Sequence, residues 1–138
     1  MATNTEHLVS YLKAIDAHDL DSVRNVYADD VAIRAPGTEL DGRDAAAAWM
    51  DAFRRAFPDL RHEILSTAEA DDTVALEARF TATHTGPLAS PDGDIPPTGK
   101  AVDLVYADVL RFTSGRIRSE HVYFDQLGFL TQLGLMPG

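Results

Sequence analysis

The chain has 138 residues, 45% of them hydrophobic, which fits one domain over residues 1–138 with a core of its own. Its 22 acidic and 12 basic residues give a net charge of -10 at pH 7, and phosphate backbones and anionic membrane surfaces would repel such a protein. We therefore expect neither a nucleic-acid partner nor a membrane partner. The absence of cysteine excludes disulfides and thiolate chemistry. Residues 1–7 lack a basic segment followed by an apolar one, so we expect a cytoplasmic protein.

The first part of the chain predicts helices. Thr3 and Glu6 have the spacing of a capping box, and the apolar residues that follow recur at helical intervals, which predicts a helix over residues 6–17. Asp19 or Asp21 can cap a second, shorter helix.

A brief strand over residues 31–33 and a third helix follow. Pro36 and Gly37 end the strand, and the helix opens near residues 41–44. Its apolar face includes Trp49 and Phe53, and Pro58 stops it.

The hydrophobic period then changes from helical to alternating, which predicts strands. The expected elements are strands at residues 60–68, 74–84, 100–112 and 116–125, and a short closing helix at residues 126–133. Residues 85–99 contain four prolines and three glycines and predict a long loop, which is uncommon in a small domain unless it acts as a lid or a binding loop. Helices followed by strands with short turns predict an α+β fold, with a curved, largely antiparallel sheet packed on the N-terminal helices.

Two polar residues fall on apolar strand faces and indicate a pocket. Asp108 lies among the apolar even-numbered residues of the strand at 100–112, and burial there would raise the pKa of its carboxyl and favour the neutral acid. His84 continues the apolar face of the strand before it. Both residues are predicted to face one concave space, although a buried acid bonded to a neighbour and a satisfied strand-end histidine would also fit.

The order of several short motifs resembles one known family, the SnoaL-like polyketide cyclases of the superfamily that includes nuclear transport factor 2 and ketosteroid isomerase. The motifs are His18-Asp19-Leu20-Asp21, Tyr27-Ala28-Asp29-Asp30, Phe57-Pro58-Asp59-Leu60, His84-Thr85-Gly86-Pro87, Pro97-Thr98-Gly99-Lys100 and the closing run from Tyr123 to Leu135. The resemblance implies a cone-shaped fold, a homodimer, and a small hydrophobic substrate such as a polyketide or another polycyclic compound. Because this superfamily carries many activities, the resemblance bears more on fold than on chemistry.

The resemblance also implies catalytic residues. The acid/base aspartate of the family matches Asp125, although a strand-end aspartate also caps a following helix well. Comparison with ketosteroid isomerase matches Asp108 to its protonated aspartate and Tyr11 to its oxyanion tyrosine, while the position of its general base is Ala35. Alanine cannot move a proton, so steroid isomerisation is doubtful. Tyr11 could equally be a core residue.

The remaining candidates are expected to bind substrate; they are Trp49, Phe53, Tyr106, Glu120, His121 and Tyr123. Glu120 and His121 point to opposite faces of the last strand, and periodicity does not say which one enters the pocket. Asp125 shares its face with His121, so a β-bulge near the strand end would swap this assignment. No spacing of His, Asp or Glu matches a metal site, and we expect neither a metal nor another cofactor.

The sequence therefore predicts a cofactor-independent acid/base enzyme for a small hydrophobic carbonyl compound. Asp125 would move a proton alpha to the carbonyl, as in aldol ring closure, while Asp108 with Tyr11 or His84 would stabilise the enolate oxygen. Two alternatives stay open: a hydrolase that activates water against an epoxide, and a binding module without catalysis.

Overall fold

The helices and strands of the computed structural model follow one another along residues 2–90 and 92–136, the part of the chain that the structure describes. The helices are α1 (Asn4–Asp16), α2 (Leu20–Val26), α3 (Arg43–Ala56) and α4 (Gln126–Gln132). The strands are β1 (Tyr27–Ala35), β2 (Thr38–Asp41), β3 (Arg61–Ala70), β4 (Thr73–Thr83), β5 (Ala101–Thr113) and β6 (Arg116–Tyr123). No helix in these two ranges is long and apolar enough to cross a membrane.

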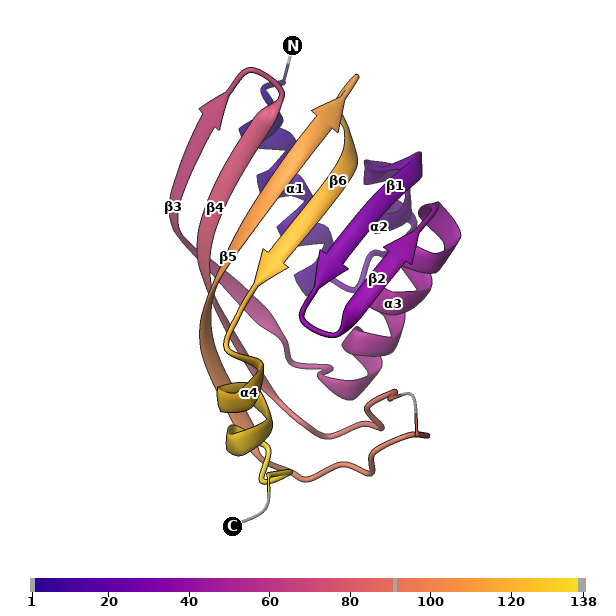
Figure 1. The fold of residues 1–138 in the computed structure, drawn as a ribbon, viewed down its shortest axis with the longest axis vertical. Coiled ribbons are helices and arrows are strands. Elements are labelled where there is room, and N and C mark those ends of the chain that lie inside the picture. The colour runs from indigo at the N-terminus through magenta and orange to yellow at the C-terminus, as the bar shows by residue number, and fades with distance from the viewer. Residues whose placement is uncertain (1, 91, 137–138) are drawn as a thin grey trace.

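All six strands form one sheet in the order β2-β1-β6-β5-β4-β3 (Figure 1). Every neighbouring pair is antiparallel except β1 and β6, which run parallel. The sheet is therefore mixed but largely antiparallel, as expected. β1 is longer than the brief strand that the sequence indicated, and β2 was not predicted, because a strand of four residues carries too little alternation to be recognised.

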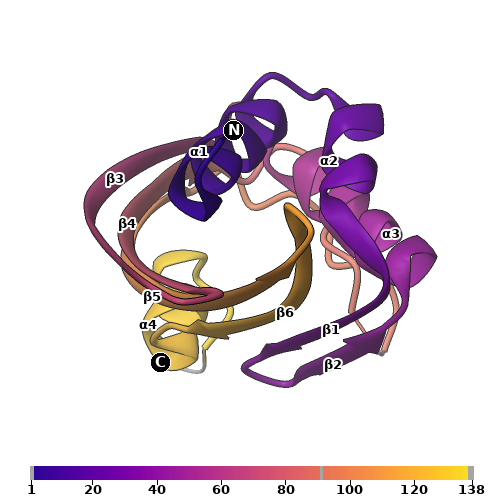
Figure 2. The same ribbon diagram turned by 90° about the horizontal axis from the view of Figure 1, so that it is seen from above.

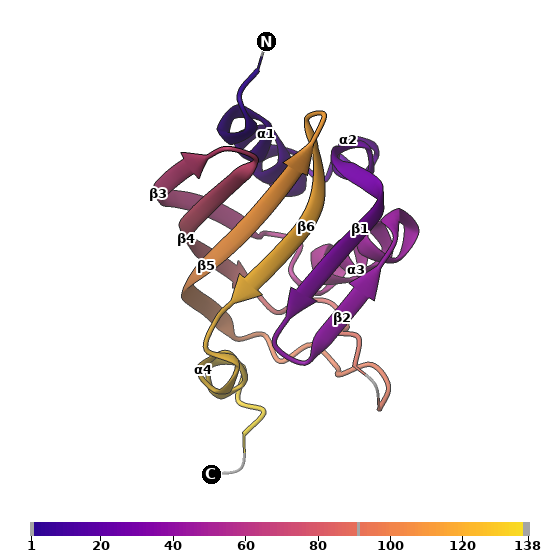
Figure 3. The same cartoon turned by 45° about the horizontal axis from the view of Figure 1, so that its top comes forward.

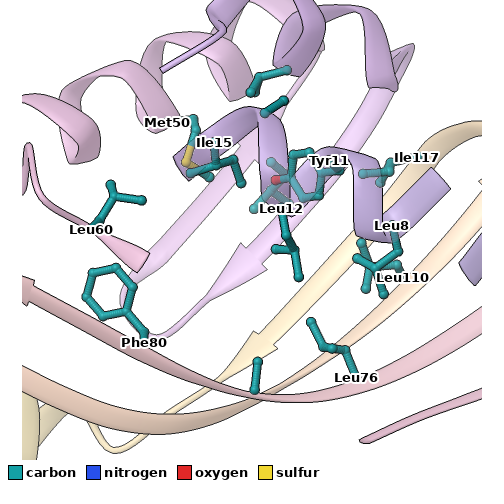
Figure 4. Close-up of a cluster of buried hydrophobic side chains, with 14 of the residues drawn as sticks. Leu8, Tyr11, Leu12, Ile15, Met50, Leu60, Leu76, Phe80, Leu110 and Ile117 are labelled. Carbon is teal, nitrogen blue, oxygen red and sulfur yellow. The ribbon is translucent and has the colours of Figure 1, made fainter. Parts of the chain in front are cut away.

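The sheet curves around α1, and α2 and α3 lie beside β1 (Figures 2 and 3). The capping box at the start of α1 is confirmed: the hydroxyl of Thr3 accepts from the amide of Glu6 at 3.1 Å, and the Glu6 carboxylate accepts from the amide of Thr3. Leu8, Tyr11 and Ile15 of α1 point into the core (Figure 4). The predicted α+β fold, a curved sheet packed on N-terminal helices, is confirmed.

One irregularity decides which residues of β6 face the concave side of the sheet. Phe112 of β5 pairs with Ile117, but Arg111 pairs with Ser119, so Arg118 is an extra residue in β6. A β-bulge of this kind reverses the alternation of side chains beyond it. Ile117 and Glu120 are consequently both buried on the inner face.

Candidate functional site

A cavity of about 320 Å³ lies between the concave face of the sheet, α1, α3 and α4. This volume is at the lower end of the range for small-molecule pockets. Its wall is mostly apolar and includes Trp49, Phe53, Phe80, Leu104, Phe124 and Phe129. The titratable side chains in the wall are Tyr11, His62, Tyr106, Asp108 and Glu120. Among the described residues, no lysine or arginine contributes to the lining.

Asp108 lies in the middle of β5 with its side chain in the cavity wall, as the sequence predicted. Only 2% of the residue is exposed. Burial raises the pKa of its carboxyl well above the ordinary value, and the nearby charge of Glu120 and hydrogen bonding with it raise the pKa further. Within the described part of the chain, Oδ1 of Asp108 has no hydrogen-bond partner. Burial therefore favours the neutral form of Asp108, and Oδ1 is left without a partner among the described residues.

Glu120 lies on the neighbouring strand β6, two residue pairs along the β5–β6 ladder from the pair that contains Asp108. Asp108 pairs with Val122 and Leu110 pairs with Glu120, so the two carboxyls are diagonal neighbours on the inner face. Glu120 is 4% exposed, and its Oε1 accepts a hydrogen bond from the Tyr11 hydroxyl at 3.0 Å. The bulge at Arg118 thus resolves the choice between Glu120 and His121 in favour of Glu120.

Two tyrosine hydroxyls extend this network. The Tyr11 and Tyr27 oxygens are 2.7 Å apart, and their rings meet edge to face at 5.6 Å. The single hydroxyl hydrogen of Tyr11 is used in the hydrogen bond to Glu120. In the bond between the two tyrosines, Tyr27 is therefore the donor and Tyr11 the acceptor. Burial raises the pKa of both hydroxyls well above the ordinary value, and the charge of Glu120 adds to this effect. Tyr11 is in the predicted place, whereas no sequence signal distinguished Tyr27 from a core tyrosine.

His62 of β3 also lines the cavity, although no pattern in the sequence distinguished it from other strand residues. Its Nδ1 lies 2.7 Å from Oδ1 of Asp16, and its backbone amide donates to Oδ2 of Asp16 at 2.9 Å. The partners are 46 residues apart, so only the folded chain brings them together.

Asp125 does not lie where the sequence predicted the catalytic base. Its carboxylate accepts a hydrogen bond from the amide of Gly128 at 2.8 Å and caps the N-terminus of α4. The side chain is exposed and does not contribute to the cavity wall, although its neighbours Phe124 and Gln126 do. The placement of Asp125 in the pocket is therefore corrected: its Oδ1 accepts a hydrogen bond at the helix end, and the cap alternative describes its geometry.

His84 is buried but does not line the cavity. Its Nδ1 accepts a hydrogen bond from the amide of Thr98 at 3.1 Å, and its ring packs on Phe57 at 5.4 Å between centroids. Burial lowers the pKa of this imidazole, which favours the neutral ring. The expected pocket role of His84 is thus corrected: the side chain fixes the end of the loop that Thr98 closes.

Some of the predicted substrate-binding residues line the cavity, and the others lie on the outer face of the sheet. Trp49, Phe53 and Tyr106 line the cavity as expected, together with Glu120. His121 and Tyr123 do not, because the bulge turns them to the outer face, where Tyr123 is 58% exposed. These two assignments are corrected.

The loop between β4 and β5 contributes part of the cavity wall. Leu88, Ala89, Ser90 and Ile95 line the cavity, and Leu88 and Ile95 form a small β-bridge. The amides of Thr85 and Gly86 donate to the carbonyl of Ala56 and anchor the start of the loop to the end of α3. Pro91 of the predicted loop lies outside the described residues. The loop is therefore positioned as a lid or binding loop would be.

Comparison with known proteins shows the family of the chain. The family model described as SnoaL-like polyketide cyclase matches residues 5–133. No curated protein matched the sequence. Of the solved structures, AclR from Streptomyces galilaeus, a proposed hydroxylase, is 25% identical and has a TM-score of 0.80, with 98% of this chain and 87% of that chain covered.

Two further structures are proposed polyketide cyclases. The SnoaL-like protein from Jannaschia sp. CCS1 is 20% identical, with a TM-score of 0.84 and coverage of 97% of this chain and 93% of that chain. IdmH from Streptomyces antibioticus is 23% identical, with a TM-score of 0.78 and coverage of 96% and 99%. At these identities the two structures support the fold alone. Since the family model spans nearly the whole sequence, the chain belongs to the SnoaL-like polyketide cyclase family.

Proposed function

We propose that the protein is an acid/base enzyme that acts on a small, uncharged, hydrophobic carbonyl compound, and that its reaction is intramolecular aldol ring closure of a polyketide-like or other polycyclic substrate. The observation that carries the proposal is the buried pair of carboxyls, Asp108 and Glu120, at one side of an apolar cavity. Paired acids in such a place are costly for stability and are typical of sites that move protons.

The surroundings of the two carboxyls favour a proton on one of them and a negative charge on the other. Two carboxyls this close do not both ionise, so the pair holds one proton and one charge. Burial favours the neutral form of Asp108, and the Tyr11 hydroxyl stabilises a negative charge on Glu120. Asp108 is then the acid and Glu120 the base, which is the role that the sequence assigned to Asp125.

This assignment supports enolate chemistry. Glu120 would remove a proton from the carbon alpha to a carbonyl, and the proton of Asp108 would hydrogen-bond to the oxygen on which negative charge develops. Oδ1 of Asp108 is the atom available for that bond, because it has no partner among the described residues. The enolate carbon can then attack a second carbonyl of the same substrate and close a ring. All of these steps use side chains that are present in the chain.

The charge of the cavity supports the choice of substrate. A bound phosphate or carboxylate would lie against the charge of the carboxyl pair, and no lysine or arginine in the described lining would offset the repulsion. The largely apolar wall instead favours a neutral, hydrophobic ligand whose few polar atoms meet the polar side of the cavity.

A homodimer is part of the proposal. Val105 and Tyr123 are exposed apolar side chains on the outer face of the central strands, at 52% and 58% of their surface. A second copy of the chain that covers this face would bury them.

Isotope labelling tests the proposal and its alternatives. The wild-type protein is incubated in D₂O with a panel of polycyclic ketones, and in H₂¹⁸O with the matching epoxides, and the products are analysed by mass spectrometry. Deuterium at the alpha carbon supports the proposal. Oxygen-18 in an opened epoxide, without deuterium exchange, would replace it with a hydrolase. Binding without either label would replace it with a binding module, and fluorescence of Trp49, the single tryptophan of the chain, reports that binding from within the cavity wall.

A further inference from the structure

His62 lies in the cavity wall and pairs with Asp16, and the two form a second polar group on different elements from Asp108 and Glu120. Asp16 is the last residue of α1, and His62 is the second residue of β3. One oxygen of the carboxylate meets Nδ1 of the ring at 2.7 Å, and the other accepts the backbone amide of the same histidine at 2.9 Å. The imidazole is 11% exposed and the carboxylate 26%.

This two-point contact fixes the orientation of the ring. A carboxylate can only accept, so Nδ1 of His62 carries a hydrogen and donates it. Nε2 then lies on the other edge of the ring, and it forms no hydrogen bond with another described residue. The ring also packs against Phe80 and Tyr106, at 5.6 Å and 6.1 Å between centroids. An oriented histidine with one nitrogen free is the usual arrangement of a general acid or base.

Tyr106 links this group to the carboxyl pair. Burial raises the pKa of its hydroxyl, and electrostatic interaction with the carboxyls of Asp108, Glu120 and Asp16 raises this pKa further. Tyr106 therefore lies within electrostatic range of both polar groups, and a ligand in the cavity can reach both.

We propose that His62 is a second proton-transfer residue of the cavity, that Asp16 positions it, and that it protonates the oxygen of the second carbonyl during ring closure. The inference rests on the proposed function and names the residue that acts on its second carbonyl. The substrate is accordingly a compound with two carbonyls. Glu120 removes a proton from the carbon alpha to the first carbonyl, and His62 protonates the oxygen of the second.

The steps balance. Glu120 takes the proton from the alpha carbon, and the electron pair of that C–H bond forms the enolate. The enolate carbon forms the new C–C bond with the second carbonyl carbon, whose C=O π electrons move to oxygen. That oxygen takes a proton from Nε2 of protonated His62 and becomes a hydroxyl. Glu120 is left protonated and His62 neutral, and a proton passing between them through solvent restores both, so the reaction is an isomerisation.

Two probes separate His62 from the carboxyl pair. β-Tetralone has one carbonyl and reports alpha-proton exchange in D₂O. A cyclohexanone bearing an oxobutyl side chain has two carbonyls and reports closure to a fused bicyclic aldol. The measured quantity is the ratio of the closure rate to the exchange rate. His62→Asn keeps a donor for Asp16 but has no group at the position of Nε2. His18→Asn is the matched control, because His18 is exposed, lies outside the cavity wall and has a positive φ of 59° that asparagine adopts readily.

His62→Asn should lower the ratio by at least about tenfold, since general acid catalysis contributes a factor of roughly 100 or more. His18→Asn should leave it unchanged. A wild-type ratio in a folded His62→Asn protein would overturn the role of His62 and leave the proposed function intact. A wild-type protein that neither exchanges the first probe nor closes the second would instead contradict the proposed function, and the His62 inference would fall with it.

Nitrogen-15 NMR of the wild-type imidazoles gives a test that needs no variant of His62. For His62 to donate from Nε2, its ring should carry a hydrogen on Nε2 as well as on Nδ1, and its Nε2 resonance should shift when β-tetralone binds. Asp16→Asn should reduce the doubly protonated population as well as the closure ratio, whereas a purely structural aspartate would change stability alone. An Nε2 resonance that does not respond to bound ligand would contradict the inference.

Discussion

The hydroxyl of Tyr11 donates a hydrogen bond to Oε1 of Glu120 across 3.0 Å, between residues 109 positions apart in the chain. This bond joins α1 to β6 inside the concave side of the sheet, and in the proposed mechanism it favours the negative charge on Glu120 rather than on Asp108. The position of Tyr11 follows from the helical period of α1, but the position of Glu120 depends on the β-bulge at Arg118.

Replacement of Tyr11 by phenylalanine removes the donor to Glu120. We expect Tyr11→Phe to lower the rate of deuterium incorporation into β-tetralone by roughly tenfold or more, because a buried charge loses a hydrogen bond. Tyr27→Phe removes a bond only to Tyr11 and should cost less. Equal losses in both variants, measured at the same pH, would show that Tyr11 does not act through Glu120.

The raised pKa of Asp108 predicts a dependence of stability on pH. Between the ordinary pKa of an aspartate and the raised pKa, the unfolded chain has released the proton that the folded chain keeps. Stability is therefore highest below the ordinary value and falls as the pH rises toward the raised value. Asp108→Asn removes this titrating group, so the stability of the variant relative to wild type should increase as the pH rises above the ordinary pKa of an aspartate, by up to about 1.4 kcal/mol per pH unit. Urea unfolding at several pH values measures the difference, and parallel curves would contradict it.

Asp125 has the geometry of a cap, which predicts little effect of an asparagine. Asp125→Asn should keep both stability and exchange activity near wild type, because asparagine caps helices about as well as aspartate. Asp125→Ala should cost about 0.5 to 2 kcal/mol in urea unfolding and leave the exchange rate of the folded protein unchanged. If Asp125→Asn lost activity without losing stability, the catalytic role expected from the sequence would be restored.

The exposed outer face of the sheet predicts a dimer. The wild-type protein should sediment as a dimer at tens of micromolar, and Val105→Lys should shift it toward the monomer by placing a charge in the contact. Ala45→Lys is the control, since it adds the same charge on the exposed side of α3. A wild-type monomer, or equal behaviour of the two variants, would count against an interface on this face.

Local sequence patterns predicted many of the helices and strands of the fold. The capping box of Thr3 and Glu6, the stop at Pro58 and the alternation in β4 and β5 are signals within one element, and the structure contains each of those elements. The parallel pairing of β1 with β6 was not predictable in the same way, because it joins segments about 90 residues apart that share no local signal.

In the candidate site, too, the residues marked by a local sequence pattern were predictable, and those placed by contacts in the folded chain were not. Asp108 was predictable because a single acid interrupts an apolar strand face. Glu120 and His121 could not be separated, since periodicity does not reveal the extra residue Arg118 that turns Glu120 inward. Asp125 was placed in the pocket because a cap and a base use the same residue type at a strand end. Asp16 could not be found from the sequence, because its contact with β3 exists only in the folded chain.

The most direct test of the account is the rate of deuterium incorporation at the alpha carbon of β-tetralone, measured for wild type, Glu120→Gln and Glu39→Gln. Glu39→Gln is the matched control, because Glu39 is exposed on β2. Glutamine keeps the size of Glu120 and can still accept from Tyr11, but it cannot take up a proton at neutral pH. If Glu120 is the base, Glu120→Gln should lose roughly two to four orders of magnitude in exchange rate, while Glu39→Gln should match wild type. A folded Glu120→Gln protein that exchanges the ketone at the wild-type rate would contradict the assignment of Glu120 as the base.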